Sequence, residues 1–142
     1  MIDVETIVIP RRLFDILVNH AKESRPYESV SIIAGNVKDN IATAEFVYTP
    51  ENIEKSTVTF TVDPIILLDI YTEVEKKGKY IIGIYHTHPA PPKPSATDID
   101  FMQVNPYVWL ISSTSNPENP KGYILENNNS LRKVEIMIKN EE

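Results

Sequence analysis

The segment 79–98 reads KYIIGIYHTHPAPPKPSATD and decides how the rest of the chain is interpreted. Its first half is an apolar run rich in Ile and Tyr, which is typical of a buried strand. The run ends in His86 and His88, directly before a proline-rich loop. Alternate residues of an extended segment point to the same side, so the two imidazoles can converge on one ion while Thr87 faces away. The pattern therefore predicts a metal site at the end of a strand.

The two histidines alone leave a zinc site incomplete, because catalytic zinc usually has three protein ligands and keeps a fourth position for water. Asp98 is the nearest credible third ligand, in the first turn of a short helix expected over 96–103. Two surface or hydrogen-bonded histidines without a metal are an alternative for the His-x-His pair taken by itself. The third histidine, His20, lies among polar neighbours on an expected helix, and we interpret it as a surface or helix-end residue and not as a ligand.

Composition narrows the class of protein. A length of 142 residues is enough for one domain with its own core. The chain has no cysteine, which excludes disulfides, thiolate zinc sites and a cysteine nucleophile. A net charge of −6 without a basic stripe argues against a nucleic-acid partner. No segment approaches the ~20 apolar residues of a membrane span, and the N-terminus does not resemble a signal peptide. A cytoplasmic protein without membrane association is therefore expected.

Apolar periodicity predicts an α/β (α+β) fold, a mixed β-sheet flanked by helices. Helical spacing predicts one helix over 10–23 and a second that begins at Pro64, with Asp63 as its N-cap, and ends at Gly78. A long polar loop is expected over 112–122. Besides the segment before the histidines, strands are expected over 2–9, 27–35, 41–48, 57–62, 107–113, 123–126 and 131–138.

Three sequence features together resemble the JAMM motif of the MPN+ (JAB-domain) zinc metalloproteases. They are Glu28 before a short apolar strand, the HTHP sequence at 86–89 and the PSATD sequence at 94–98. The resemblance extends to FTVDP at 60–64 and IGIY at 82–85, and so it covers most of the chain. It implies an MPN/JAB-domain architecture, similar to that of cytidine deaminases, and a single domain over 1–142.

The resemblance also implies a role for each motif residue. His86, His88 and Asp98 would bind one zinc ion per chain, with a water in the fourth position. Glu28 would accept a proton from that water as it attacks the scissile carbonyl, and would then pass the proton to the departing amine. Ser95 would donate a hydrogen bond to the developing oxyanion or help to position the water.

The same resemblance implies a substrate. Members of the family hydrolyse isopeptide or peptide bonds after the Gly-Gly tail of ubiquitin or ubiquitin-like proteins, and this chain resembles the minimal prokaryotic or archaeal kind, a deubiquitinase-like or desampylase-like protease. Two alternatives stay open: a processing protease for a sulfur-carrier protein, and a zinc-binding MPN module that binds partners without catalysis. The tail would add as a strand beside the site, flanked by the loops 49–57 and 112–121.

Three positions depart from the family pattern. The spacer PAPPKP before Ser95 is one residue shorter than usual. Thr87 stands where serine is commoner, and Ser31 stands where glycine is usual. The shorter, proline-stiffened spacer affects the placement of Ser95 most, because Asp98 can still follow on the short helix.

Overall fold

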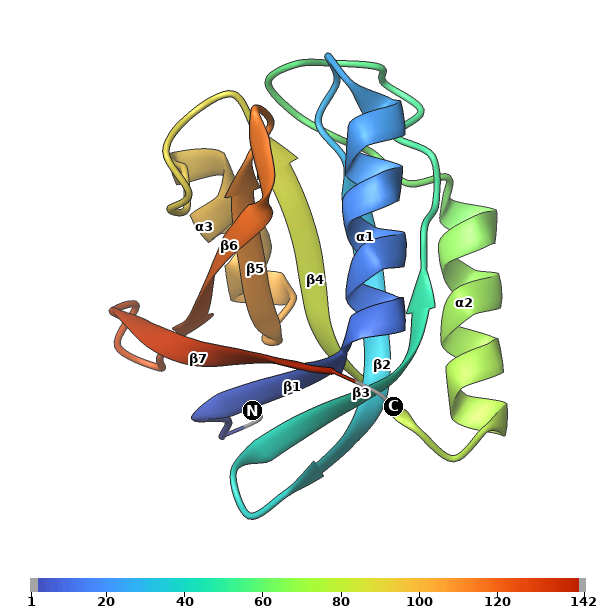
Figure 1. Cartoon of the computed structure of the whole chain (residues 1–142), viewed down its shortest axis with the longest axis vertical. Coiled ribbons are helices and arrows are strands. Elements are labelled where there is room, and N and C mark those ends of the chain that lie inside the picture. The colour runs from blue at the N-terminus through green and yellow to red at the C-terminus, as the bar shows by residue number, and fades with distance from the viewer. Residues whose placement is uncertain (1–2, 141–142) are drawn as a thin grey trace.

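A sheet of seven strands with three helices around it makes up residues 3–140, the part of the chain that this computed structural model describes (Figure 1). The strands close into a barrel in the order β1-β3-β2-β4-β5-β6-β7. The sheet is mixed, since β1 pairs in parallel with β3 and β7, and β4 with β5, while the other pairs are antiparallel. This confirms the predicted α/β fold class. The elements are β1 (Thr6–Pro10), α1 (Arg11–Ser24), β2 (Val30–Lys38), β3 (Ile41–Tyr48), α2 (Pro64–Lys76), β4 (Tyr80–His88), α3 (Ala96–Val104), β5 (Val108–Ser113), β6 (Asn116–Leu125) and β7 (Leu131–Lys139).

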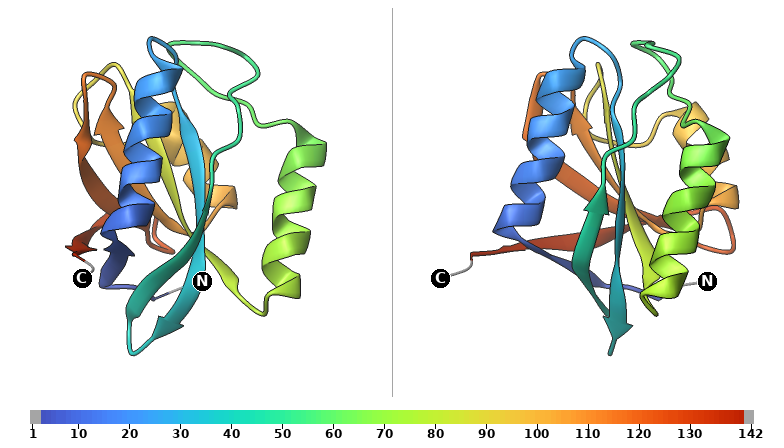
Figure 2. Two further views of the ribbon diagram at one scale, coloured as in Figure 1. Left: turned by 45° about the vertical axis from the view of Figure 1, so that its right-hand side comes forward. Right: turned by 90° about the vertical axis from the view of Figure 1, so that its right-hand side faces the viewer.

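The helices lie on both faces of the β2–β4 part of the sheet. Helix α1 covers one face, and α2 and α3 cover the other (Figure 2). Helical spacing places the apolar residues of α1 on one stripe that faces the core. The buried residues of this stripe are Leu13, Phe14, Leu17, Val18 and Ala21. Helix α2 begins as predicted, with the Asp63 carboxylate accepting a hydrogen bond from Ile65 N at 2.8 Å. None of the helices described is long and apolar enough to cross a membrane.

Two predicted elements are wrong. Residues 57–62 form a loop instead of a strand, because their backbone bonds to the side chain of Asn52 and not to a neighbouring strand. Residues 116–122 belong to β6 and are not part of a long loop. Pro117 and Pro120 are tolerated there because they lie where the register between β5 and β6 shifts, so their missing N–H groups remove no regular ladder bonds.

A bulge in β4 decides which face of the sheet carries the histidines. Ile33 pairs with Gly83 and Ala34 with Ile81, so Ile82 is an extra residue in β4. Ile82 packs into the core beneath α1, whereas Ile84, two residues later, packs on the α3 side. In a regular strand, residues two apart such as Ile82 and Ile84 lie on the same face. The extra residue shifts the register by one, and this moves every following side chain to the opposite face. The bulge therefore directs the end of β4 toward α3.

Candidate metal centre

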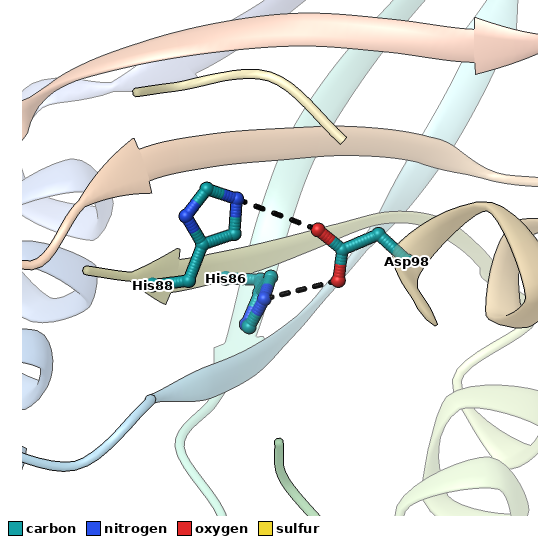
Figure 3. A group of neighbouring side chains, drawn as sticks. All are labelled: His86, His88 and Asp98. Atoms are coloured by element: carbon teal, nitrogen blue, oxygen red, sulfur yellow. Dashed lines mark ion pairs between the residues drawn. The ribbon is translucent and has the colours of Figure 1, made fainter. Parts of the chain in front are cut away.

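Two neighbouring elements bring the three predicted ligands together. His86 and His88 project from the end of β4, and Asp98 reaches them from the first turn of α3 (Figure 3). One possible ligand atom from each residue lies within 4.8 Å of the others. All three side chains are buried, at 1%, 5% and 2% exposure. Thr87 faces away as predicted, and its Oγ1 contacts the hydroxyl of Ser29 at 2.7 Å.

The ring of His86 is oriented by the backbone carbonyl of Ser29, the residue directly before β2. Its Nδ1 lies 3.0 Å from the carbonyl oxygen of Ser29, which can only accept, so Nδ1 carries the proton. Its Nε2 then presents a lone pair, 3.1 Å from Asp98 Oδ1 and 3.4 Å from Glu28 Oε1. No hydrogen bond of good geometry satisfies this buried nitrogen within residues 3–140. A lone pair that faces two carboxylates is stabilised by a cation between them, and a backbone carbonyl behind the other ring nitrogen is typical of metal-binding histidines.

The surroundings of His88 do not select one of its two ring nitrogens as the metal ligand. Its Nε2 lies 3.0 Å from the carbonyl of Lys93 and 3.5 Å from Asp98 Oδ2, while its Nδ1 is buried without a hydrogen-bond partner in the described chain. Lys93 belongs to the shortened spacer PAPPKP, so this loop brings a competing acceptor to the ring. His88 can therefore offer a metal whichever ring nitrogen does not carry the proton, Nδ1 in one tautomer and Nε2 in the other. Either way, two imidazoles and a carboxylate are a donor set that suits zinc.

Asp98 is held in place by the start of its own helix. Ser95 is the N-cap of α3, and its Oγ accepts a hydrogen bond from Asp98 N at 3.1 Å. In return, Asp98 Oδ2 accepts from Ser95 N at 3.0 Å, which completes a capping box. Burial alone would raise the pKa of Asp98, but His86, the Ser95 N–H and His88 outweigh it and hold that pKa below its usual value. The carboxylate is thus kept ionised, as a metal ligand must be. The catalytic role of Ser95 stays a prediction.

Glu28 lies beside the three-residue cluster, just before β2. Its side chain is buried, and Oε1 is the atom 3.4 Å from His86 Nε2. Burial raises the pKa of Glu28 to about 7, a shift that His86 opposes and that the Asp98 carboxylate increases. A carboxyl group with a pKa near neutrality can both take up and release a proton, which is what general acid–base catalysis requires.

Two aromatic side chains, Phe60 and Trp109, lie next to His86 and also line an apolar pocket of about 240 Å³. The Phe60 ring lies 4.8 Å from the His86 ring, and the Trp109 ring lies 6.4 Å from it. Phe60 was predicted in a strand. Asn52 was predicted only as part of the loop 49–57, and neither residue was predicted to contact the site. No local pattern marks either residue, because their contacts depend on how the 50–63 loop folds back on Glu28.

Comparisons with known proteins agree with this geometry. Residues 10–125 match the family described as prokaryotic homologs of the JAB domain. The chain is 34% identical over 84 residues to a desampylase of Pyrococcus furiosus, covering 58% of this chain and 59% of that protein. It is 32% identical over 95 residues to a probable TtuB-protein conjugate cleaving protease of Thermus thermophilus, covering 66% of this chain and 61% of that protein. The matched region thus spans less than two thirds of either relative.

A solved structure gives the same answer for the fold. The solution structure of a Desulfitobacterium hafniense protein superposes with a TM-score of 0.81 at 27% identity, and the match covers 96% of this chain and 94% of that one. The helix before Glu28, the histidine-bearing β4 and the short helix with Asp98 all fall inside the residues that the family match covers. The chain therefore belongs to the family of prokaryotic homologs of the JAB domain.

Proposed function

We propose that residues 1–142 form a single JAMM-type metalloprotease domain that hydrolyses the bond after the Gly-Gly tail of a ubiquitin-like modifier. In this proposal His86, His88 and Asp98 hold one zinc ion. The observation that carries it is the buried cluster of these three groups, with Glu28 Oε1 only 3.4 Å from His86 Nε2. Structural zinc sites are usually closed by four ligands and rich in cysteine, whereas three ligands beside a free carboxyl group are typical of catalytic ones.

The choice of substrate rests on the relatives. One is named a desampylase and another a probable TtuB-protein conjugate cleaving protease, and the second name describes cleavage of a protein conjugate. A ubiquitin-like modifier joined through its C-terminal tail is the substrate class that fits these names and the family resemblance. A tail that ends in glycines is also narrow enough to pass close to buried side chains.

The residues of this chain divide the work of hydrolysis. Zinc, when bound, acts as a Lewis acid and lowers the pKa of a coordinated water toward 7. Glu28 accepts the proton that the water loses as its oxygen attacks the scissile carbonyl carbon. When the carbon–nitrogen bond breaks, Glu28 returns this proton to the departing amine, so that it ends the cycle unchanged. The carbonyl of Ser29 keeps the proton of His86 on Nδ1 and so leaves Nε2 free for the metal.

The test combines metal content with cleavage. Zinc per chain is measured by mass spectrometry in the parent, in the His86→Ala/His88→Ala double variant and in Glu28→Gln. His20→Gln is the matched control, because it removes the one histidine outside the cluster. Each protein is then incubated with a ubiquitin-like protein fused or conjugated through its Gly-Gly tail. We expect one zinc in every protein except the double variant. The parent and His20→Gln should cleave at full rate, Glu28→Gln should keep only a small residual rate, and the double variant should not cleave.

Other results would count against parts of the proposal. A parent without zinc after reconstitution would refute the ligand set. Zinc without cleavage of any modifier would favour a metal-binding MPN module that acts through its partners. Cleavage that persists after the Gly-Gly pair is replaced by bulky residues would refute recognition of the tail. Cleavage of a C-terminally extended sulfur-carrier protein but of no conjugate would favour a processing protease.

A further inference from the structure

Asn52 is buried in the loop between β3 and α2, and its amide group is fully used. Its exposure is 7%. Its Nδ2 donates to the carbonyl oxygens of Glu28 and Thr59, at 3.0 and 3.1 Å. Its Oδ1 accepts from the backbone N–H groups of Glu54 and Thr61, both at 3.1 Å. A primary amide has two hydrogens and two acceptor sites, so each of them has a partner here.

These bonds connect the loop to the proposed general base. The carbonyl of Glu28 is bound by Asn52, and the N–H of Glu28 donates to the carbonyl of Ser56, at 2.8 Å. Both residues belong to the same loop. The backbone of Glu28 is therefore fixed on each side by the loop, before the regular pairing of β2 begins at Val30.

The same loop carries the aromatic cover of the cluster. Thr59 and Thr61, the residues on either side of Phe60, are both bound to the Asn52 amide. The Phe60 ring packs against His86 at 4.8 Å and lies 6.5 Å from the ring of Trp109. One side chain thus fixes the base and the cover relative to each other.

We infer that Asn52 is a positioning residue for the reaction. All four hydrogen bonds of its amide go to backbone groups, and it acts by holding the Glu28 carboxyl group and the Phe60 ring against the side chains of His86, His88 and Asp98. This inference rests on the proposed function. The loop 52–61 contributes no proposed ligand, but it determines whether the Glu28 carboxyl group is correctly placed for proton transfer. A displacement of about 1 Å can lower a catalytic rate by a factor of about 100.

The decisive variant is Asn52→Asp. A carboxylate cannot donate, so the bonds to the carbonyls of Glu28 and Thr59 are lost, while the two acceptor contacts can persist. We expect kcat to fall about 100-fold, KM to change much less, and zinc content to stay at one per chain, because the proposed ligands lie on β4 and α3. Val134→Ala is the control for loss of stability alone, since Val134 is a buried core residue on β7. Its kcat should match that of the parent below its unfolding temperature.

Two further measurements separate positioning from a general loss of structure. Trp109 is the only tryptophan and is buried, so release of the loop should increase its quenching by acrylamide in Asn52→Asp but not in Val134→Ala. In the Glu28→Gln background, Asn52→Asp should lower the residual rate no further, because the group that it positions is already gone. An additive loss in that background would overturn the inference.

The remaining outcomes are equally decisive. Parent-like kcat in Asn52→Asp, or loss of zinc along with activity, would overturn the inference. If Asn52→Asp does not fold, Asn52→Ser is measured in its place, and failure of both to fold would assign Asn52 to the stability of the whole domain. If the parent holds zinc but cleaves no modifier, the proposed function fails, while tryptophan quenching and zinc content still decide whether Asn52 anchors the loop.

Discussion

Replacement of Ser95 separates the capping of α3 from a contribution to chemistry. Ser95→Ala removes the oxygen that accepts from Asp98 N at 3.1 Å, and so it breaks one half of the capping box. Loss of an N-cap side chain costs about 1 kcal/mol of unfolding free energy. In a chain of this length, that cost lowers the Tm by about 3 °C. The hydroxyl hydrogen of Ser95 is not used in this bond, so it is free to serve a substrate.

Ser95→Asn distinguishes the two roles. Asparagine caps helices as well as serine does, so the unfolding free energy should stay within about 0.3 kcal/mol of the parent value. It has no hydroxyl group, however. If that hydroxyl stabilises the developing oxyanion, both Ser95→Ala and Ser95→Asn should lose about 100-fold or more in kcat, the effect of removing one such donor. Ser95→Thr, which keeps both a cap and a hydroxyl, is the control.

The assays are thermal unfolding with zinc in excess and the rate of cleavage of a Gly-Gly fusion. A Tm for Ser95→Ala equal to that of the parent would refute the contribution of the cap. Cleavage by Ser95→Asn at the parent rate would refute the hydroxyl's role. Ser95 would then act on the reaction only by holding Asp98.

Three further predictions concern the fold and the metal. Gly35→Ala should lower the unfolding free energy by about 3 kcal/mol in chemical denaturation, because its Cβ would overlap the carbonyl oxygen of Thr43. Gly78→Ala, where nothing lies within 4 Å, should cost only about 1 kcal/mol for its positive φ. Burial lowers the pKa of His20 below its usual value of 6.5, so the contribution of this histidine to stability should be complete above pH 6.5 and be lost as the pH falls through the lower folded-state pKa. When the unfolding free energy is measured against pH, His20→Gln should lose less of it than the parent between these two pKa values. Equal profiles for the two proteins would refute this. A chelator should lower the Tm of the parent, since a metal present at 100 times its Kd adds about 2.7 kcal/mol, and it should leave the Tm of the double histidine variant unchanged.

The sequence predicted the parts of the fold that local chemistry determines. Helix α2 begins where Asp63 and Pro64 supply a cap and a compatible first turn, and the strand that ends in the two histidines was evident from its apolar run. The expected loop over 112–122 was wrong because a register shift accommodates prolines that otherwise argue against a strand. The strand expected over 57–62 was wrong because β-branched residues there bond to a side chain up to nine residues away. Secondary-structure propensities of single residues do not predict such a bond.

The candidate site was predictable as a set of residues but not as a geometry. Which face of the sheet His86 occupies depends on the extra residue Ile82, and no period-2 pattern reveals a bulge. The pKa of Glu28 depends on burial by a loop whose fold the sequence did not disclose.

The burial of the site also has an energetic consequence. Two carboxyl groups and two imidazoles lie together with at most 5% exposure each, and they are held there from opposite sides. Ser95 fixes Asp98, the Ser29 carbonyl fixes His86, and the Asn52 loop fixes Glu28. Ionised groups brought out of water in this way destabilise a fold unless an opposite charge compensates them. The hydrogen bonds around the four side chains therefore hold them together although their burial destabilises the fold, and a bound cation would offset this destabilisation. The chelator experiment measures the stabilisation by the cation, and the Asn52 experiment measures the effect of the hydrogen bonds.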